Sequence, residues 1–228
     1  MELAPLWISI KTASVATVVT FFLGIFAAHA IVRLKRFQGI IDGIVTLPMV
    51  LPPTVVGFFL LMIFGKRSLF GQFLAQFDVS IVFSWTATVI SATVVSFPLM
   101  YRTTRGAFEQ IDMNLVYAAR TLGMSEIKIF WKVILPNAWY GIAAGTILAF
   151  ARALGEFGAT IMIAGNIPGR TQTLSTAVYS AVQNGDDKAA YEYVAVILTI
   201  SFTVMMLMNY WTKSQGRNSK KSVPKGAG

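Results

Sequence analysis

The chain has 228 residues, of which 55% are apolar and 13% charged, and its formal net charge is +9. This composition excludes an ordinary soluble globular domain and indicates a protein whose main solvent is the lipid bilayer. The chain contains no cysteine, which excludes a disulfide framework and a thiolate metal or redox site.

Five apolar stretches reach the roughly 20 residues that a helix needs to cross the hydrocarbon core. They lie at 12–32, 40–64, 79–101, 138–164 and 189–211. The expected fold class is therefore all-α, a polytopic transmembrane helix bundle that occupies residues 1–211. The first stretch lacks the basic flank and small-residue cleavage site of a signal peptide, so we expect it to be retained.

The basic residues predict the orientation of the bundle. With the N-terminus outside, the internal segments hold thirteen lysines and arginines and the external segments hold five, while Arg152 lies within a span. This excess follows the positive-inside rule and places the C-terminus in the cytoplasm. The positive charge therefore reports topology and contact with membrane lipid, and we expect no nucleic-acid partner.

The second stretch contains Pro48, Pro52 and Pro53. Three prolines remove three backbone donors, so this helix must be broken or kinked. A break at membrane depth is tolerated where neighbouring helices or water satisfy the freed carbonyls. These prolines therefore mark either a gate region beside a cavity or a purely structural kink.

The fourth stretch combines small residues with two charges. Its small residues recur at four-residue spacing, which lets membrane helices approach closely. They form two rows, Gly141, Gly145 and Ala149, then Ala151, Gly155 and Ala159. Arg152 and Glu156 are four residues apart and can pair. They are either a structural ion pair or candidates for the transport pathway, because an isolated charge facing lipid is costly.

Two further segments complete the chain. Residues 171–184 are too few to span a membrane, so they form a re-entrant helix that caps a pore or an interfacial helix that links two spans. The tail 212–228 is basic and nearly without apolar residues, and it is expected to be disordered in the cytoplasm.

The loop 102–136 carries the clearest pattern outside the spans. Asp112 can cap one helix, Gly123 ends it, and Ser125 begins a second helix that Pro136 should stop. The second helix carries Ile127, Phe130, Trp131 and Ile134 at helical spacing. Such an apolar face either docks on a partner protein or packs on its own bundle, and the pattern alone does not decide between them.

The loop also resembles a motif of known transporters. Tyr117-Ala118-Ala119, then Gly123 after three residues, then Val133-Ile134-Leu135-Pro136 after nine more, is similar to the Glu-Ala-Ala loop of binding-protein-dependent ABC importer permeases. Two departures stand out, since Tyr117 replaces the acidic residue and Val133 replaces an isoleucine. The first departure puts any ionic contact of that position in doubt.

The resemblance extends over nearly the whole chain and narrows to the molybdate importer permeases. The segments that carry it are 47–57, 65–71, 151–160 and 165–169. The last two are shared with sulfate permeases, which are usually longer. Sulfate, thiosulfate and tungstate therefore remain as alternative substrates.

The resemblance implies a non-catalytic subunit with the type I ABC importer permease fold in the inner membrane. Its implied partners are a second copy of this chain, two ABC ATP-binding subunits and a periplasmic molybdate-binding protein. ATP and Mg²⁺ would bind on the ATP-binding subunits, and this chain would hold neither a cofactor nor a metal. The positions implied in coupling to the ATPase are Tyr117, Ala118, Ala119, Arg120, Leu122, Gly123, Met124, Leu135 and Pro136.

Two other classes of function are weighed against a permease. An intramembrane enzyme would need facing catalytic groups such as a Ser-His pair or a His-Glu-x-x-His site, and the sequence contains neither pattern. A secondary transporter would show broken helices in both halves of the chain, whereas proline clusters interrupt only the second stretch.

Overall fold

The structure, a computed structural model, describes residues 2–34 and 36–219, and every regular element within them is helical. The elements in chain order are α1 (Ala4–Val32), α2 (Gln38–Val50), α3 (Pro53–Phe64), α4 (Leu69–Ala75), α5 (Trp85–Glu109), α6 (Met113–Thr121), α7 (Glu126–Ile129), the π-helix η1 (Phe130–Ile134), α8 (Leu135–Leu154), α9 (Gly158–Ile163), α10 (Leu174–Gln183) and α11 (Asp187–Ser219).

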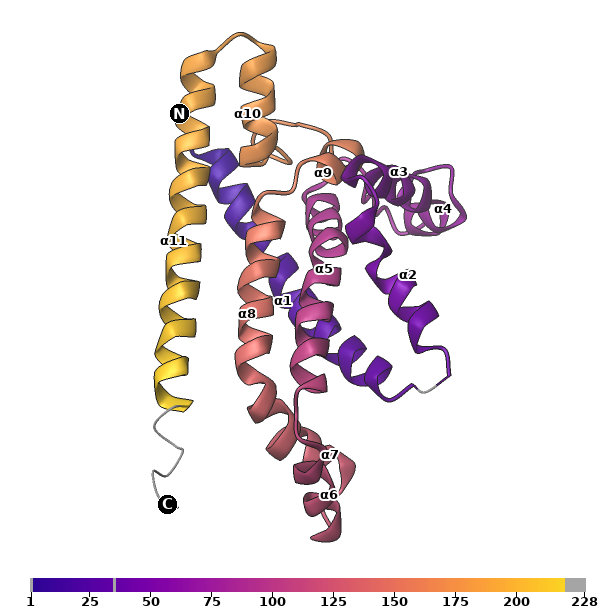
Figure 1. Ribbon diagram of the computed structural model, residues 1–228. Coiled ribbons are helices and arrows are strands. Elements are labelled where there is room, and N and C mark those ends of the chain that lie inside the picture. Colours follow the sequence, from indigo (N-terminus) through magenta and orange to yellow (C-terminus); the bar gives the residue numbers. More distant parts are fainter. Residues whose placement is uncertain (1, 35, 220–228) are drawn as a thin grey trace.

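The long helices run in alternating directions along one axis (Figure 1). Helices α1, α5 and α11 descend in that view, while α2 and α8 rise. Helices α6 and α7 lie at the lower end, and α3, α4, α9 and α10 lie at the upper end. The alternation brings segments far apart in the sequence side by side, and it leaves the predicted loop at one end of the bundle.

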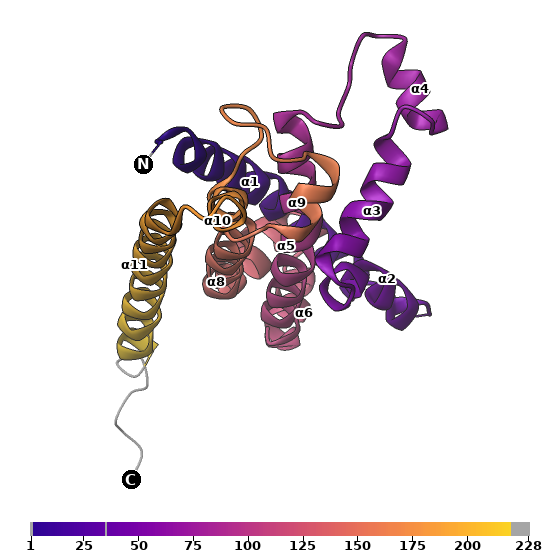
Figure 2. The same ribbon diagram turned by 90° about the horizontal axis from the view of Figure 1, so that it is seen from above.

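Helix α5 is the centre of the bundle, with α1, α8, α2 and α9 packed around it (Figure 2). Its buried Met100, Tyr101 and Phe108 join residues of α1 and α8 in the largest apolar cluster. By contrast, α11 contacts mainly α10 and a short part of α8, and most of its apolar surface is exposed.

The row of small residues predicted in the fourth stretch brings α8 against α5. A Cβ atom added to Gly141 would lie 2.4 Å from Cβ of Ala107, and one on Gly145 would lie 3.1 Å from Cβ of Thr103. Ala149 is fully buried. The small residues thus allow the close helix contact that substitutes for a hydrophobic driving force within lipid.

Within the described residues, three helices are long and apolar enough to cross a membrane. They are Ala4–Val32, the continuous helix Glu126–Leu154 and Asp187–Met208, and the bent pair α2 and α3 makes a fourth if it is counted as one span. The predicted span at 79–101, now α5, is not among them. Its hydroxyl side chains, among them Thr88, Ser91 and Ser96, lower its mean hydropathy, and they make hydrogen bonds inside the bundle.

The second stretch is broken where the prolines predict. Helices α2 and α3 meet at an angle of 109° across Leu51 and Pro52. Pro48 lies inside α2, Pro52 is the N-cap residue of α3, and Pro53 is its first residue. Because α3 turns away from the axis of α2, the two do not form one straight crossing.

The prediction of one uninterrupted fourth span, 138–164, is wrong. Helix α8 ends at Leu154, and the short helix α9 begins at Gly158 in a new direction. Gly155 is the exposed C-cap residue of α8 and Ala159 belongs to α9, so the second predicted row of small residues does not lie on one helix. Gly155 has φ of −87°, so α8 ends here without the left-handed glycine that commonly closes a helix.

The last two predictions concern α10 and the tail. Helix α10 lies alongside α11, joined by a turn at Gly185, and its buried Leu174 and Ala177 cluster with Tyr193 of α11.

Helix α11 continues through Ser219, whereas the sequence predicts disorder from residue 212. No proline interrupts the chain before Pro224, so the helical backbone can extend beyond the apolar segment. Residues 220–228 lie outside the described residues.

Candidate functional site

The loop between α5 and α8 folds into a short helical hairpin, as the sequence predicts. The Asp112 carboxylate accepts a hydrogen bond from the Asn114 backbone N–H at 2.9 Å and caps α6. Gly123 has φ of 75°, a left-handed conformation that a side chain would disfavour. The Met124 N–H donates to the Ala119 carbonyl, which closes the turn before α7 begins. The Asp112 cap, the first helix, the glycine turn and the second helix are therefore confirmed, whereas Ser125 is the N-cap residue of α7 without a capping hydrogen bond from its side chain.

The hairpin buries one face and exposes the other. Val116 and Ala119 of α6 pack on Ile129 of α7 in a small apolar cluster. On the outer side, the side chain of Leu122 is 81% exposed and that of Tyr117 is 54% exposed. The hairpin packs on itself and still presents apolar side chains outward, so docking of this surface on a partner stays a prediction. We call Tyr117, Ala118 and Leu122 the α6 outer face.

The second helix of the hairpin does not stop at Pro136, so that prediction is wrong. Residues Phe130–Ile134 form a π-helix, in which the Leu135 N–H donates to the Phe130 carbonyl, and α8 continues from there with Pro136 in its first turn. Pro136 cannot donate an N–H into this continuous helix, and the π-turn directly before it is a local adjustment of the kind that accommodates such a missing donor. The hairpin is thus joined to α8 without a flexible linker.

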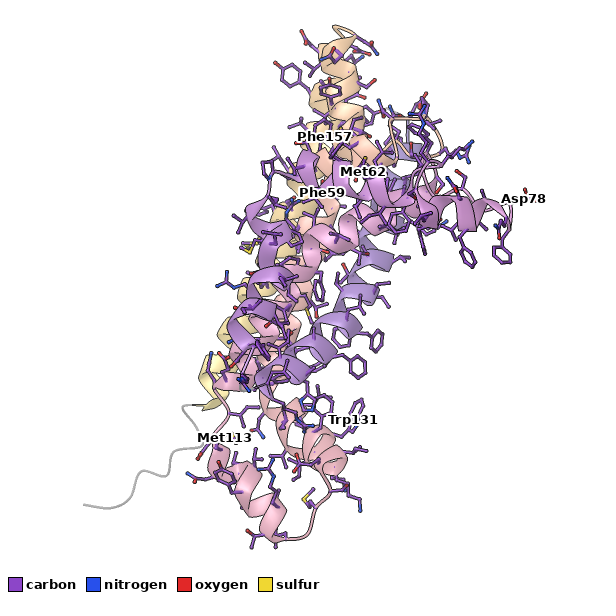
Figure 3. All side chains as sticks on the ribbon, turned by 90° about the vertical axis from the view of Figure 1, so that its right-hand side faces the viewer. Phe59, Met62, Asp78, Met113, Trp131 and Phe157 are labelled. Carbon is purple, nitrogen blue, oxygen red and sulfur yellow. The ribbon has the colours of Figure 1, made fainter. Side chains whose placement is uncertain are left out.

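The π-turn also changes which residues of the second helix face outward. Ile129 and Phe130 are buried, whereas Ile127 and Trp131 are exposed. Figure 3 shows Trp131 and Met113 at the end of the bundle that carries the hairpin. The apolar face predicted at regular helical spacing is therefore divided between the interior and the surface.

Glu126 connects the hairpin to the end of α1. Its Oε1 accepts a hydrogen bond from Arg120 Nε at 2.7 Å, and its Oε2 accepts one from Arg33 Nη2 at 3.2 Å. The Arg120 hydrogen bonds lower the pKa of the Glu126 carboxyl, which therefore stays ionised at neutral pH. Arg120 also lies 5.9 Å from the ring centroid of Tyr117. Although Tyr117 replaces the usual acidic residue, the neighbouring arginine still has a carboxylate partner.

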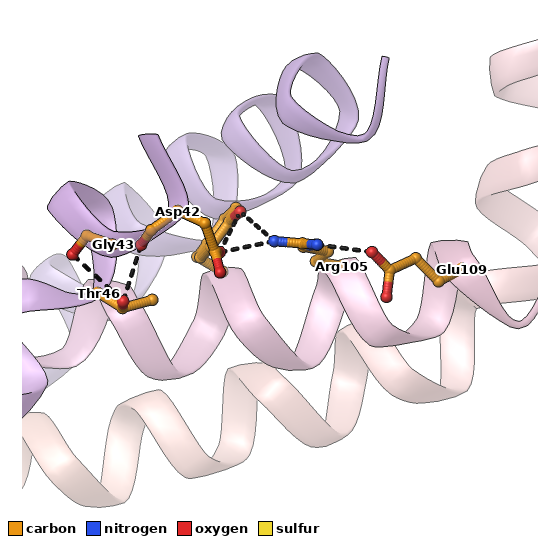
Figure 4. Close-up of polar contacts among 6 residues, drawn as sticks. Asp42, Gly43, Thr46, Arg105 and Glu109 are labelled. Carbon is orange, nitrogen blue, oxygen red and sulfur yellow. Dashed lines mark hydrogen bonds and ion pairs between the residues drawn. The ribbon is translucent and has the colours of Figure 1, made fainter. Parts of the chain in front are cut away.

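A second polar network joins α2 to α5 near the same end (Figure 4). Arg105 Nη1 lies 2.7 Å from Asp42 Oδ1, and its Nε donates to Glu109 Oε1 at 2.7 Å. The Tyr101 hydroxyl donates to the same oxygen of Asp42 at 2.8 Å. Three charged groups and a hydroxyl thus fix the position of α2 against the central helix.

Arg152 and Glu156 form the ion pair that their spacing predicts. Arg152 Nη1 lies 2.8 Å from Glu156 Oε2, and Glu156 Oε1 accepts the backbone N–H of Ala159 at 2.8 Å. The Glu156 side chain is 2% exposed, while that of Arg152 is 35% exposed. Glu156 therefore links the end of α8 to the start of α9, and Arg152 is the partner that reaches the surface.

The break between α2 and α3 at Pro52 lies far from the hairpin. It lies beside α9, which follows the Arg152 and Glu156 pair. A Cβ atom added to Gly158, the first residue of α9, would lie 2.9 Å from Cβ of Pro53. A Cβ atom added to Gly57 of α3 would lie 2.7 Å from Cα of Ala159 in α9. The broken second stretch and the broken fourth stretch thus pack on each other at the end of the bundle opposite the hairpin.

Comparison with known proteins places this architecture in a family. The model of the family described as "Binding-protein-dependent transport system inner membrane component" matches residues 20–218. The chain belongs to this family. It is therefore the membrane component of an ABC importer, a class whose ATP hydrolysis takes place on a partner subunit.

The relatives found among curated proteins include several molybdenum permeases. The chain is 43% identical over 206 residues to "Putative molybdenum transport system permease protein YvgM" of Bacillus subtilis, covering 90% of this chain and 91% of the relative. It is 41% identical to "Molybdenum transport system permease protein ModB" of Escherichia coli, covering 90% of each. The "Sulfate transport system permease protein CysT" of Salmonella typhimurium is 34% identical over 92% of this chain and 76% of its own length.

Solved structures agree with the fold. A chain of the MetNI methionine ABC transporter in an inward-facing conformation matches with a TM-score of 0.73 at 16% identity, covering 92% of this chain and 94% of that one. A bacterial ABC transporter for the polysaccharide alginate matches with a TM-score of 0.73 at 14% identity, covering 93% and 79%. The type I ABC importer permease fold is thereby confirmed, while the number of spans and the orientation of the termini stay predictions.

The sequence does not predict two of the ion pairs near the hairpin. Arg33 and Glu126 are separated by 93 positions, and Asp42 belongs to the second predicted span while Arg105 belongs to the predicted loop 102–136. The sequence offers one signal for these pairs. Asp42 and Glu126 lie among an excess of basic residues near the predicted inner ends of the spans. That signal indicates pairing without identifying the partners.

Proposed function

We propose that the chain is the permease subunit of an ATP-driven molybdate importer, a multi-pass protein of the inner membrane with its N-terminus outside and its C-terminus in the cytoplasm. The observation that carries this proposal is the 41–43% identity to molybdenum permeases over about 90% of both chains. The lower identity to the sulfate permease, and its lower coverage, favours molybdate over sulfate.

The partners follow from the same reasoning. The exposed α6 outer face supports docking of an ABC ATP-binding subunit, because large apolar side chains on a short capped helix suit a groove on another protein. The largely exposed α11 leaves room for a second copy of this chain or for lipid. A homodimer with two ATP-binding subunits and a periplasmic molybdate-binding protein is the assembly that we propose.

The mechanism is the transmission of motion. When the ATP-binding subunits close, they move the hairpin of α6 and α7. The continuous helix from Glu126 to Leu154 carries that motion along α8, and the Glu126 ion pairs carry it to the end of α1. Alternating access results from the relative movement of these helices, with Pro48, Pro52 and Pro53 as the region where the far end rearranges.

The Arg152 and Glu156 pair has a structural role in this proposal. A buried carboxylate that accepts a backbone hydrogen bond and pairs with an arginine satisfies its own charge. The exposed part of Arg152 can still attract an anion in the pathway without binding it tightly, since tight binding would obstruct release.

The test is the stimulation of ATP hydrolysis by oxyanions. The permease is purified with its co-expressed ATP-binding subunit, reconstituted into liposomes and supplied with the loaded binding protein. Molybdate is expected to stimulate ATP hydrolysis and uptake, with tungstate and sulfate measured in parallel. Stimulation by sulfate alone would overturn the substrate assignment, and uptake driven by a proton or sodium gradient without the ATPase would indicate a secondary transporter instead.

A further inference from the structure

A groove runs between α5 and α8 at the end of the bundle that carries the hairpin. It has a volume of about 630 Å³, and its lining includes Arg102, Thr103 and Gln110 of the α5 segment and Asn137 and Tyr140 of α8. None of these residues belongs to the coupling positions or to the intramembrane ion pair. The groove therefore needs an explanation of its own.

Among the residues that the structure describes, Arg102 lines this groove without a carboxylate partner, unlike four other arginines of the chain. Arg33, Arg105, Arg120 and Arg152 each pair with a carboxylate at 3.2 Å or less. Within the described part of the chain, no carboxylate lies within ion-pair distance of Arg102. Its exposed guanidinium offers donors in the planar arrangement that suits a tetrahedral oxyanion.

The groups beside Arg102 add hydrogen-bond donors for an anion and also limit the affinity of the groove for that anion. The Asn137 amide donates one N–H to the Val133 carbonyl at 2.7 Å and keeps a second N–H, while the Gln110 amide is exposed. The Asp112 carboxylate also lines the groove, although one of its oxygens is engaged by the Asn114 N–H. Arg102 and the amide donors attract an anion, while the Asp112 carboxylate repels it, so the site binds an anion weakly. Weak binding suits a position from which the anion must leave.

The groove also lies on the side of α8 that meets α5. Gly141 lines the groove, and Gly145 and Arg152 fall on the same side of the helix at four and eleven residues beyond it. Arg152 is fifteen residues beyond Asn137, which is about 22 Å along the helix axis. By helical spacing, Arg152 therefore lies on the groove side of α8, further along the helix.

We propose that this groove is a transient binding site for a tetrahedral oxyanion, with Arg102 as its main cation. The inference rests on the proposed function, because it makes the groove the place where the transported anion is released toward the cytoplasm. A phospholipid phosphate has the same chemistry, so the experiment must separate a free anion from a lipid headgroup.

The experiment measures molybdate binding to the permease in complex with its ATP-binding subunit, without the binding protein. The complex is placed in nanodiscs of phosphatidylcholine alone and in nanodiscs that also contain phosphatidylglycerol. Bound molybdenum is measured by mass spectrometry after equilibrium dialysis. The variants are R102Q, R102K and N137D, and R36Q is the matched control because Arg36 is exposed and does not line the groove.

The expected result is about fivefold weaker molybdate binding in R102Q and in N137D, in both lipid compositions, with R36Q unchanged. R102K should fall between R102Q and wild type, because lysine keeps the charge and loses the planar pair of donors. Fivefold corresponds to about 1 kcal/mol at 1.4 kcal/mol per decade. Equal binding in R102Q and R36Q would overturn the proposal. So would an R102Q effect confined to retained phosphatidylglycerol, which would identify a lipid site.

The failure of this inference is distinguishable from failure of the proposed function. The wild-type complex with its binding protein is assayed in the same preparation for ATP hydrolysis stimulated by molybdate. Absence of stimulation would count against the proposed function, whereas normal stimulation combined with unchanged binding in R102Q would count against the groove alone.

Discussion

Replacing Gly141 with alanine tests the contact between α8 and α5. The added Cβ would lie 2.4 Å from Cβ of Ala107, whereas ordinary contacts begin at 3.4 Å. Ala107 has no rotamer that could move away. The two helix backbones must therefore separate by about the difference between the 2.4 Å contact and the ordinary 3.4 Å contact. Overpacking of this kind typically costs about 1–3 kcal/mol. We therefore expect G141A to lower the stability of the permease by an amount in that range.

The assay is thermal unfolding of the purified complex in detergent, followed by fluorescence-detected size exclusion. A107G should restore most of the stability of G141A because it removes the colliding atom. G43A is the control, since a Cβ there meets nothing within 4 Å, and it should be neutral or slightly stabilising in helix α2. A G141A variant as stable as G43A, or one that A107G fails to rescue, would refute the close contact of these helices.

Three further substitutions test the hairpin and the ion pair. L122E should release the ATP-binding subunit during purification because it charges the α6 outer face, whereas L69E, at an equally exposed position on α4, should retain it. E126Q should leave stability nearly unchanged, as expected for exposed ion pairs, yet reduce the uptake per ATP hydrolysed. An unchanged ratio in E126Q would contradict its role in transmission. E156Q should lower stability by about 1 kcal/mol, because it removes the ion pair while glutamine can still accept the Ala159 N–H and the remaining Arg152 charge reaches solvent. If E156Q is as stable as wild type but abolishes uptake, the structural role of the pair is wrong.

The sequence predicts those parts of the fold that depend on local chemistry. The break at Pro52 follows from missing donors, the hairpin follows from Asp112 and Gly123, and the contact between α8 and α5 follows from Gly141 and Gly145. In each case a few adjacent residues determine the outcome, so a single sequence is sufficient.

The sequence fails where a residue type has two possible roles or where partners are distant. Gly155 fits a row of small residues and also fits a helix end, and tertiary packing of α9 on α3 decides for the end. Pro136 fits a helix stop, yet the helix continues through it, and the π-turn before it accommodates the missing donor. The partner of Glu126 at the end of α1 depends on how the helices assemble, which no local pattern encodes.

The central claim is that the α6 outer face is the surface on which an ATP-binding subunit docks. The most direct measurement is photo-crosslinking from an unnatural benzophenone amino acid placed at Leu122 in the assembled complex, with Leu69 as the control position. The account predicts a covalent product between the permease and the ATP-binding subunit from position 122 and none from position 69. No product from position 122 in a complex that still contains the ATP-binding subunit, or equal products from both positions, would contradict it.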